Sequence, residues 1–150
     1  MHIFSIFSPP FLALMSLVST GLALAWALAQ GQKTALSRRK FSLLALPGVL
    51  MLLAFYSLAI HMHMDLGQWP QSIGTRGLSP ALIGHAEVAY WFFGTILLVG
   101  LALPLLLVVH ALVPKLRRHT IYSATFGVTT WICLALTFLA PSGFLYWWWD

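Results

Sequence analysis

Two imidazoles, two thioethers and one carboxylate follow one another in the stretch His61-Met62-His63-Met64-Asp65. Imidazole is a common ligand of copper and of haem iron, and a thioether suits Cu(I). The stretch ends one apolar segment, and His85 begins the next. Because consecutive segments in a helical hairpin are antiparallel, we expect these histidines to lie at the same depth.

Two cofactors fit this group of side chains. His61 and His85, or His63 and His85, can face each other as the axial pair of a b-type haem. The three imidazoles can instead bind copper together with Met62 or Met64. In a helix His61 and His63 point apart, so only one of them would face the neighbouring helix.

Acidic side chains near this group can support it. Asp65 lies one helical turn after His61 and can orient its ring by accepting the other N–H. Glu87, close to His85, can pair with Arg76 or relay protons. The expected site therefore has His61 and His85 at its core, with Asp65 behind them.

A second pair of histidines is a weaker candidate. His110 follows His85 by 25 residues in the same segment, and His119 begins the next segment. At 1.5 Å per residue, His85 and His110 would lie about 37 Å apart. A second haem between His110 and His119 is therefore conceivable at the opposite membrane surface.

The composition indicates where these residues lie. The chain has 150 residues, of which 60% are hydrophobic and only 7% charged, and its mean hydropathy is +0.88. Soluble domains are about 45–50% apolar and about 25% charged. We therefore expect one integral membrane domain, residues 1–150, with an all-α fold.

Four apolar segments are long enough to cross a membrane as helices. They are about Phe11–Ala29, Phe41–Ile60, Val88–Val113 and Tyr122–Leu139. The sequence thus predicts a four-helix membrane bundle. Prolines inside the second and third segments should bend those helices, and glycines can allow close helix approach at Gly48, Gly94, Gly100 and Gly127.

The net charge of +5 is a topology signal and not a footprint for nucleic acid. Seven of the eight Lys and Arg residues lie in the two loops at 31–40 and 114–120. The positive-inside rule places both loops in the cytoplasm and both termini outside. The aromatic end at 145–149 would then anchor the chain at the outer interface.

Other chemistry is sparse. The three acids leave little for general acid–base catalysis, and no nucleophile elbow, phosphate-binding glycine loop or CxxC motif is present. The single cysteine, Cys133, cannot form an intrachain disulfide. We therefore expect a protein that is not an enzyme by itself.

From about Gly21 to Leu139 the chain resembles the CtaM/YozB-type family of small four-helix membrane proteins. The resemblance rests on His61, Gly74 with Arg76, His85, Pro104-Leu105, the stretch RRHTIYSATFG, Thr130-Trp131 and Thr137. One departure concerns the start of the second helix, where that family usually has a histidine and this chain has Arg38-Arg39-Lys40.

The resemblance implies a helper or accessory subunit of a respiratory haem–copper oxidase, in a bacterial inner membrane, with other membrane subunits and lipid as partners. His61 and His85 are the residues that it carries over. Two alternatives remain open from the residues alone. One is a b-type cytochrome with haem between His61 and His85, and the other is a structural subunit without a cofactor.

Overall fold

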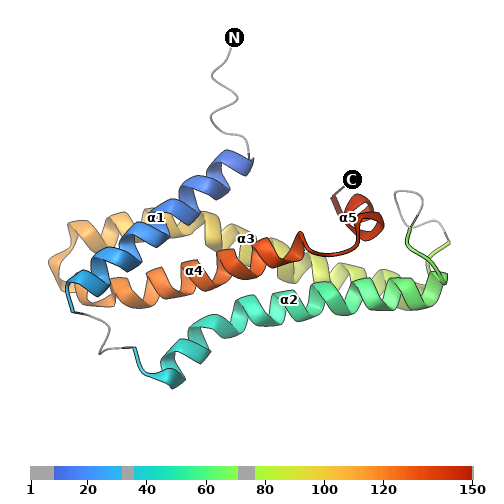
Figure 1. The fold of residues 1–150 in the computed structure, drawn as a ribbon, viewed down its shortest axis with the longest axis horizontal. Helices are drawn as coiled ribbons and strands as arrows, with labels where there is room; N and C mark the ends of the chain where they lie inside the picture. Colours follow the sequence, from blue (N-terminus) through green and yellow to red (C-terminus); the bar gives the residue numbers. More distant parts are fainter. Residues whose placement is uncertain (1–8, 32–35, 71–76, 150) are drawn as a thin grey trace, which may run out of the picture.

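The computed structural model describes residues 9–31, 36–70 and 77–149. Within these ranges the chain is helical and has no strand. Its elements are α1 (Pro9–Ala29), α2 (Arg38–Leu66), α3 (Pro80–Leu112), the 3-10 helix η3 (Pro114–His119), α4 (Thr120–Thr137) and α5 (Ser142–Trp149) (Figure 1). The expected all-α fold is therefore confirmed.

Both α2 and α3 are longer than the hydropathy pattern predicts, because polar residues cap them. α2 begins at Arg38, where the Ser37 hydroxyl accepts a hydrogen bond from the Lys40 amide at 3.3 Å. Ser79 caps α3 in the same way, by accepting from the Leu82 amide at 3.2 Å. These bonds satisfy amides that the first turn of a helix leaves without partners. The extra turns place the histidine-bearing ends within regular helix.

The short helix α5 was not expected. The turn at Phe138–Ala140 and Pro141 end the last long helix, and the chain then forms α5. The described residues thus contain five α-helices and not the predicted four. α5 lies beside α2 and α3, which extend past it, and it does not continue along the axis of α4 (Figure 1).

The four long α-helices pack lengthwise, and α1 and α2 each contact both α3 and α4. Two of the glycines sit at close approaches. A Cβ atom on Gly127 would lie 2.5 Å from Cγ2 of Thr20, and one on Gly48 would lie 3.2 Å from Sγ of Cys133. Such close backbone approach is typical of helix packing in membranes. Gly94 differs, because a Cβ there would meet nothing within 4 Å.

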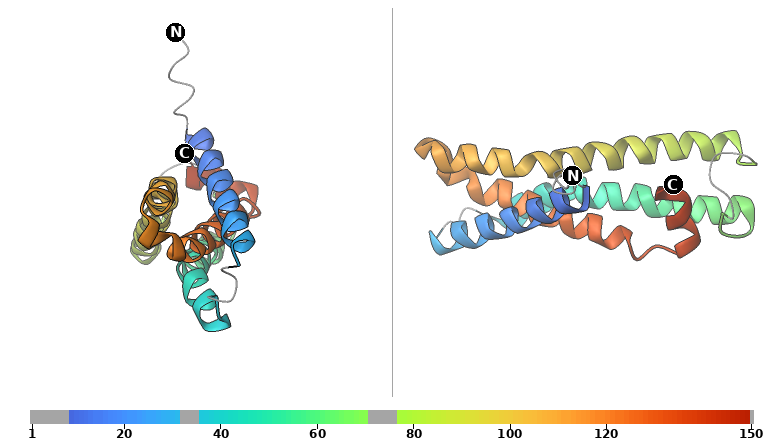
Figure 2. Two further views of the ribbon diagram at one scale, coloured as in Figure 1. Left: turned by 90° about the vertical axis from the view of Figure 1, so that its left-hand side faces the viewer. Right: turned by 90° about the horizontal axis from the view of Figure 1, so that it is seen from above.

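Three helical segments are long and apolar enough to cross a membrane: Arg38–Leu66, Pro80–Leu112 and Pro114–Thr137. α1 adds a shorter apolar stretch at Ala13–Ala29. α2 and α3 extend beyond α1 at one end of the molecule, and α5 packs there (Figure 2).

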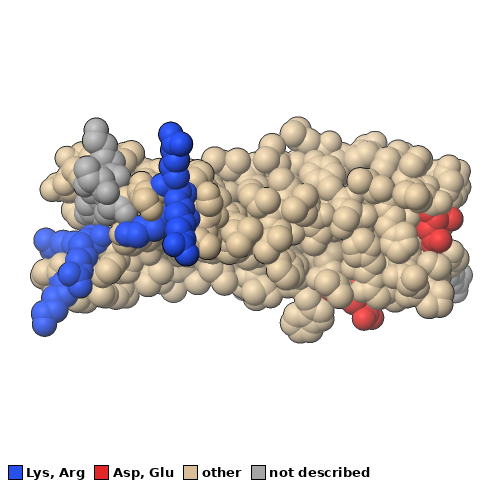
Figure 3. Space-filling view, turned by 90° about the horizontal axis from the view of Figure 1, so that it is seen from below, with Lys and Arg blue, Asp and Glu red and all other residues tan. Residues whose placement is uncertain are grey.

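Charge is separated along the long axis. The described Lys and Arg residues gather at the end formed by the start of α2 and by η3, which we call the basic end (Figure 3). The described acids, Asp65 and Glu87, lie toward the opposite end, which we call the acidic end. Lys33, Gly74 and Arg76 lie outside the described residues.

Aromatic side chains fill the interior next to α5. Phe55 of α2 makes edge contacts with Phe144 and Trp148 of α5, at ring-centroid distances of 5.1 and 4.9 Å. Trp148 also stacks on Tyr90 of α3 at 4.2 Å. α5 therefore joins α2 to α3 just inside the acidic end, where the histidines lie.

Candidate functional site

The structure brings His61 and His85 together. His61 lies in the last turns of α2 and His85 in the second turn of α3. Their Nδ1 atoms are 3.0 Å apart, and their ring centroids are 5.2 Å apart. Both side chains are partly exposed, so the pair can be reached from outside the bundle.

Ser57 extends this pair into a chain of three polar side chains. Its hydroxyl lies 2.9 Å from the Ala54 carbonyl, to which it can only donate, and 3.1 Å from Nε2 of His85. Since the hydroxyl proton is used on Ala54, Ser57 accepts a hydrogen bond from His85 Nε2. His85 Nδ1 is then the acceptor, and His61 Nδ1 donates to it.

Ser57 was not among the site residues predicted from the sequence. Ser57 precedes His61 by four residues, and residues i and i+4 lie on the same helical face. This spacing could have indicated from the sequence that Ser57 lies near the histidine pair. Ser57 orients the His85 ring from the side away from His61. This is the arrangement by which an outer partner fixes the tautomer of a ligating histidine.

The other members of the stretch point elsewhere. Met62 is fully buried in the hydrophobic core, whereas Met64 is 77% exposed. His63 stacks on Trp69 with ring centroids 4.4 Å apart. In the described part of the chain, no group of three or more His, Cys, Asp or Glu side chains is placed to hold a metal ion. No third His, Cys, Asp or Glu side chain of the described residues therefore joins His61 and His85.

Asp65 differs from the expectation, whereas the expected pairing of Glu87 with Arg76 falls outside the described residues. Asp65 accepts a hydrogen bond from the Ser79 amide at 3.4 Å, so it faces the start of α3. Glu87 is exposed and makes no hydrogen bond or ion pair with any other described residue. Asp65 thus ties α2 to α3 beside the histidines. The side chain that contacts a ring of the pair is Ser57, and that ring belongs to His85 and not to His61.

The inner-side candidates lie at the basic end. His110 is buried, and its Nδ1 atom has no hydrogen-bond partner among the described residues. His119 accepts a hydrogen bond from Nε of Arg118 at 3.1 Å through its Nε2 atom. One of the two ring nitrogens of His119 is thereby engaged with the adjacent guanidinium.

The distance between the imidazoles of His61 and His85 can be compared with the ligand spacing that each expected cofactor requires. Two imidazoles on one tetrahedral ion, each with a bond of about 2.0–2.1 Å, place their nitrogens about 3.3 Å apart. Axial ligands on opposite sides of a metal would lie about 4.1 Å apart at the same bond length, with the haem between them. The observed 3.0 Å is close to the first arrangement. In this ligand-free structure the two nitrogens are therefore as close as a hydrogen bond, or two neighbouring ligands of one ion, would place them.

Similarity to known proteins adds nothing to this geometry. No family model matches the chain, and no curated protein or solved structure gives a significant match.

Proposed function

We propose that this chain is an integral membrane protein that binds a copper ion with His61 and His85 and serves as an accessory or assembly subunit. Three long apolar helical segments and the apolar stretch of α1 support membrane insertion. The basic end supports an orientation with that end in the cytoplasm. His61 and His85 then face the outer side, in the inner membrane of a bacterium.

The 3.0 Å separation between the Nδ1 atoms carries the copper proposal. In the observed pair one proton, on Nδ1 of His61, lies between the two Nδ1 atoms. A metal ion can take its place once that proton has moved to Nε2 of His61. His85 keeps its Nε2–H on Ser57, so its Nδ1 lone pair already points toward the ion. Imidazole suits copper, and two ligands leave positions open through which the ion can be passed to another site.

The partner that we propose is a respiratory haem–copper oxidase, because the resemblance at His61 and His85 implies one. Such a protein need not catalyse a reaction by itself. It would hold copper at the outer surface, where the ion can move to or from a neighbouring membrane subunit. A b-type cytochrome is less consistent with the short distance between the two rings.

The test uses the full chain, purified from membranes in mild detergent and titrated with Cu(I) against a chromophoric chelator. We expect one copper ion per chain and no haem band in a reduced-minus-oxidised spectrum. Oxidase subunits should copurify at low detergent. A haem band with axial histidines would favour the cytochrome, and absence of both cofactors would favour a purely structural subunit.

A further inference from the structure

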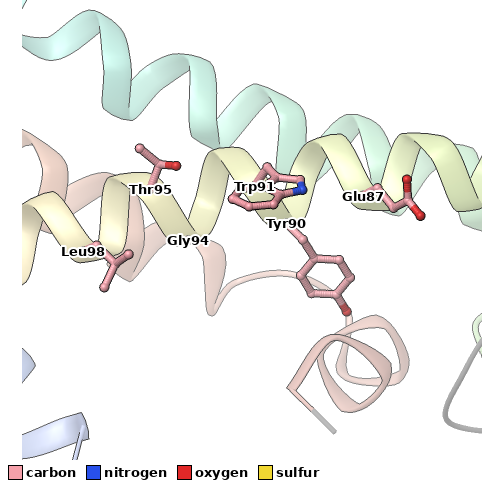
Figure 4. A pocket seen from close by; sticks show the side chains of 6 residues that line it. All are labelled: Glu87, Tyr90, Trp91, Gly94, Thr95 and Leu98. Carbon is pink, nitrogen blue, oxygen red and sulfur yellow. The ribbon is translucent and has the colours of Figure 1, made fainter.

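A groove runs along the outer face of α3. It has a volume of about 320 Å³ and is lined by Glu87, Tyr90, Trp91, Gly94, Thr95 and Leu98 (Figure 4). These residues recur at helical spacing, so they form one strip along the axis. Gly94 leaves the floor of the groove open, because even a Cβ atom there would meet nothing within 4 Å.

The end of the groove that lies nearer the start of α3 carries a charge. The Glu87 carboxylate is exposed and has no hydrogen-bond or ion-pair partner in the described part of the chain. The described Lys and Arg residues lie at the basic end, so none of them neutralises it (Figure 3). Trp91, one helical turn after Glu87 along α3, is 78% exposed. An exposed carboxylate next to an exposed indole is complementary to an organic ammonium group.

A second groove adjoins the first. It has a volume of about 390 Å³ and lies between α2 and α3, where Leu43, Leu46, Pro47 and Leu50 face Trp91, Phe92, Thr95 and Ile96. Pro47 lies inside α2, and a proline there removes a backbone hydrogen bond and bends the helix. α2 diverges from its neighbours toward the basic end (Figure 1). Trp91 and Thr95 line both grooves and separate them.

The depth of these residues matches that of a lipid headgroup. A hydrocarbon core of about 30 Å takes about 20 helical residues, and counting back from Leu112 at the end of α3 reaches the neighbourhood of Phe92. Trp91 therefore lies at the outer interface, and Glu87 lies about 6 Å farther out. Both grooves continue from this level toward the middle of the membrane.

We propose that this surface binds one molecule of phosphatidylethanolamine, given the membrane insertion on which the proposed function also rests. The ammonium group contacts the carboxylate of Glu87, and the indole N–H of Trp91 donates to a phosphate or ester oxygen. The two acyl chains follow the two grooves on either side of Trp91 and Thr95. The order of charged, hydrogen-bonding and apolar groups along α3 is the order along that lipid.

The headgroup follows from the Glu87 carboxylate, which is exposed and has no partner among the described residues. A primary ammonium has N–H donors for Glu87, whereas the quaternary ammonium of phosphatidylcholine has none. Phosphatidylglycerol has no cation, and its phosphate would be repelled by Glu87. The carboxylate therefore selects ethanolamine, and the grooves hold the acyl chains without distinguishing the headgroups.

The experiment is native mass spectrometry of the full chain in detergent, titrated with the dioleoyl forms of the three lipids. We expect phosphatidylethanolamine to bind about twofold to fivefold more tightly than the other two, the range of an exposed ion pair. Glu87→Gln should remove this preference. Asp65→Asn is the matched control, because it also removes a carboxylate at the acidic end and should leave the preference unchanged.

A second pair of variants tests the groove. Gly94→Leu fills its floor and should weaken binding of all three lipids, whereas Gly21→Leu places the same side chain in open space on α1, away from both grooves. Equal binding of the three lipids to the wild-type chain, or an unchanged preference in Glu87→Gln, would overturn the proposal. Alkaline extraction of membranes checks insertion separately, and copper binding depends on other residues. A chain that is inserted and binds copper but shows no lipid preference would contradict this inference alone.

Discussion

Ser57 accepts a hydrogen bond from Nε2 of His85 at 3.1 Å, which turns the opposite nitrogen of that ring toward His61. The bond fixes a tautomer as well as a direction, because the Ser57 proton is already donated to Ala54. In the proposed copper site, the orientation of the His85 ring thus depends on the Ser57 hydroxyl, which would not itself touch the ion.

Replacing Ser57 with alanine should weaken copper binding without abolishing it. Loss of a group that orients a ligating histidine typically costs about tenfold to 100-fold in metal affinity. Ser42→Ala is the matched control, since the Ser42 hydroxyl also bonds to a carbonyl of α2 but lies at its other end. Chelator competition measures both variants, and equal affinities would show that Ser57 has no orienting role.

Replacing His61 or His85 with alanine should remove the bound copper, because each residue supplies one of two protein ligands. His63→Ala should retain it, since His63 stacks on Trp69 instead of joining the pair. His110→Ala should also retain it, because His110 lies about 37 Å away along α3. Copper analysis of the four purified variants decides the matter. Retention of copper by both His61→Ala and His85→Ala would mean that other residues form the site.

A reporter fused after Trp149 should be active outside the cytoplasm, and one inserted at 32–35 should be active inside. The reason is that basic residues close to helix ends are retained in the cytoplasm. Each of the two reporter proteins serves as the control for the other, because they are expected to give opposite results. The reverse result would move His61 and His85 to the cytoplasmic side.

Ser16→Ala should destabilise the packing of α1. The Ser16 hydroxyl donates to the Gly100 carbonyl at 2.6 Å and accepts from the indole of Trp131 at 3.1 Å, so it links α1 to α3 and α4. Hydrogen bonds between membrane helices contribute about 0.6 kcal/mol on average and up to about 1.7. Ser19→Ala, which removes only a bond within α1, is the control. Unfolding in detergent should give a lower midpoint for Ser16→Ala alone.

Gly127→Ala should also lower stability, because its new Cβ would approach Thr20 at 2.5 Å and Leu103 at 2.9 Å. Overpacking of a well-packed core usually costs about 1–3 kcal/mol. Gly21→Ala adds the same methyl group in open space and should be neutral or slightly stabilising. Thermal unfolding of both proteins measures the difference, and equal midpoints would show that α1 and α4 can separate at no cost.

The helical segments and their depth are readable from the sequence. Long apolar runs must form helices in lipid, since each backbone amide needs a partner within its own segment. Hydropathy therefore predicted most of the ends of α2, α3 and α4 to within a few residues. The position of His61 and His85 near helix ends followed from these predicted bounds. The separation of basic residues from acids was also visible in the sequence before any packing was known.

Only the tertiary structure decided which way each side chain points. In a soluble helix the polar face marks the outside, but here the lipid-facing side is as apolar as the core. Periodicity could not show that Met62 is buried, that His63 turns to Trp69, or that His61 rather than His63 meets His85. The role of Ser57 and the folding of α5 across α2 and α3 depend on contacts between segments far apart in the chain. Such contacts are set by how the helices rotate and pack against one another, which no local pattern in this sequence specifies.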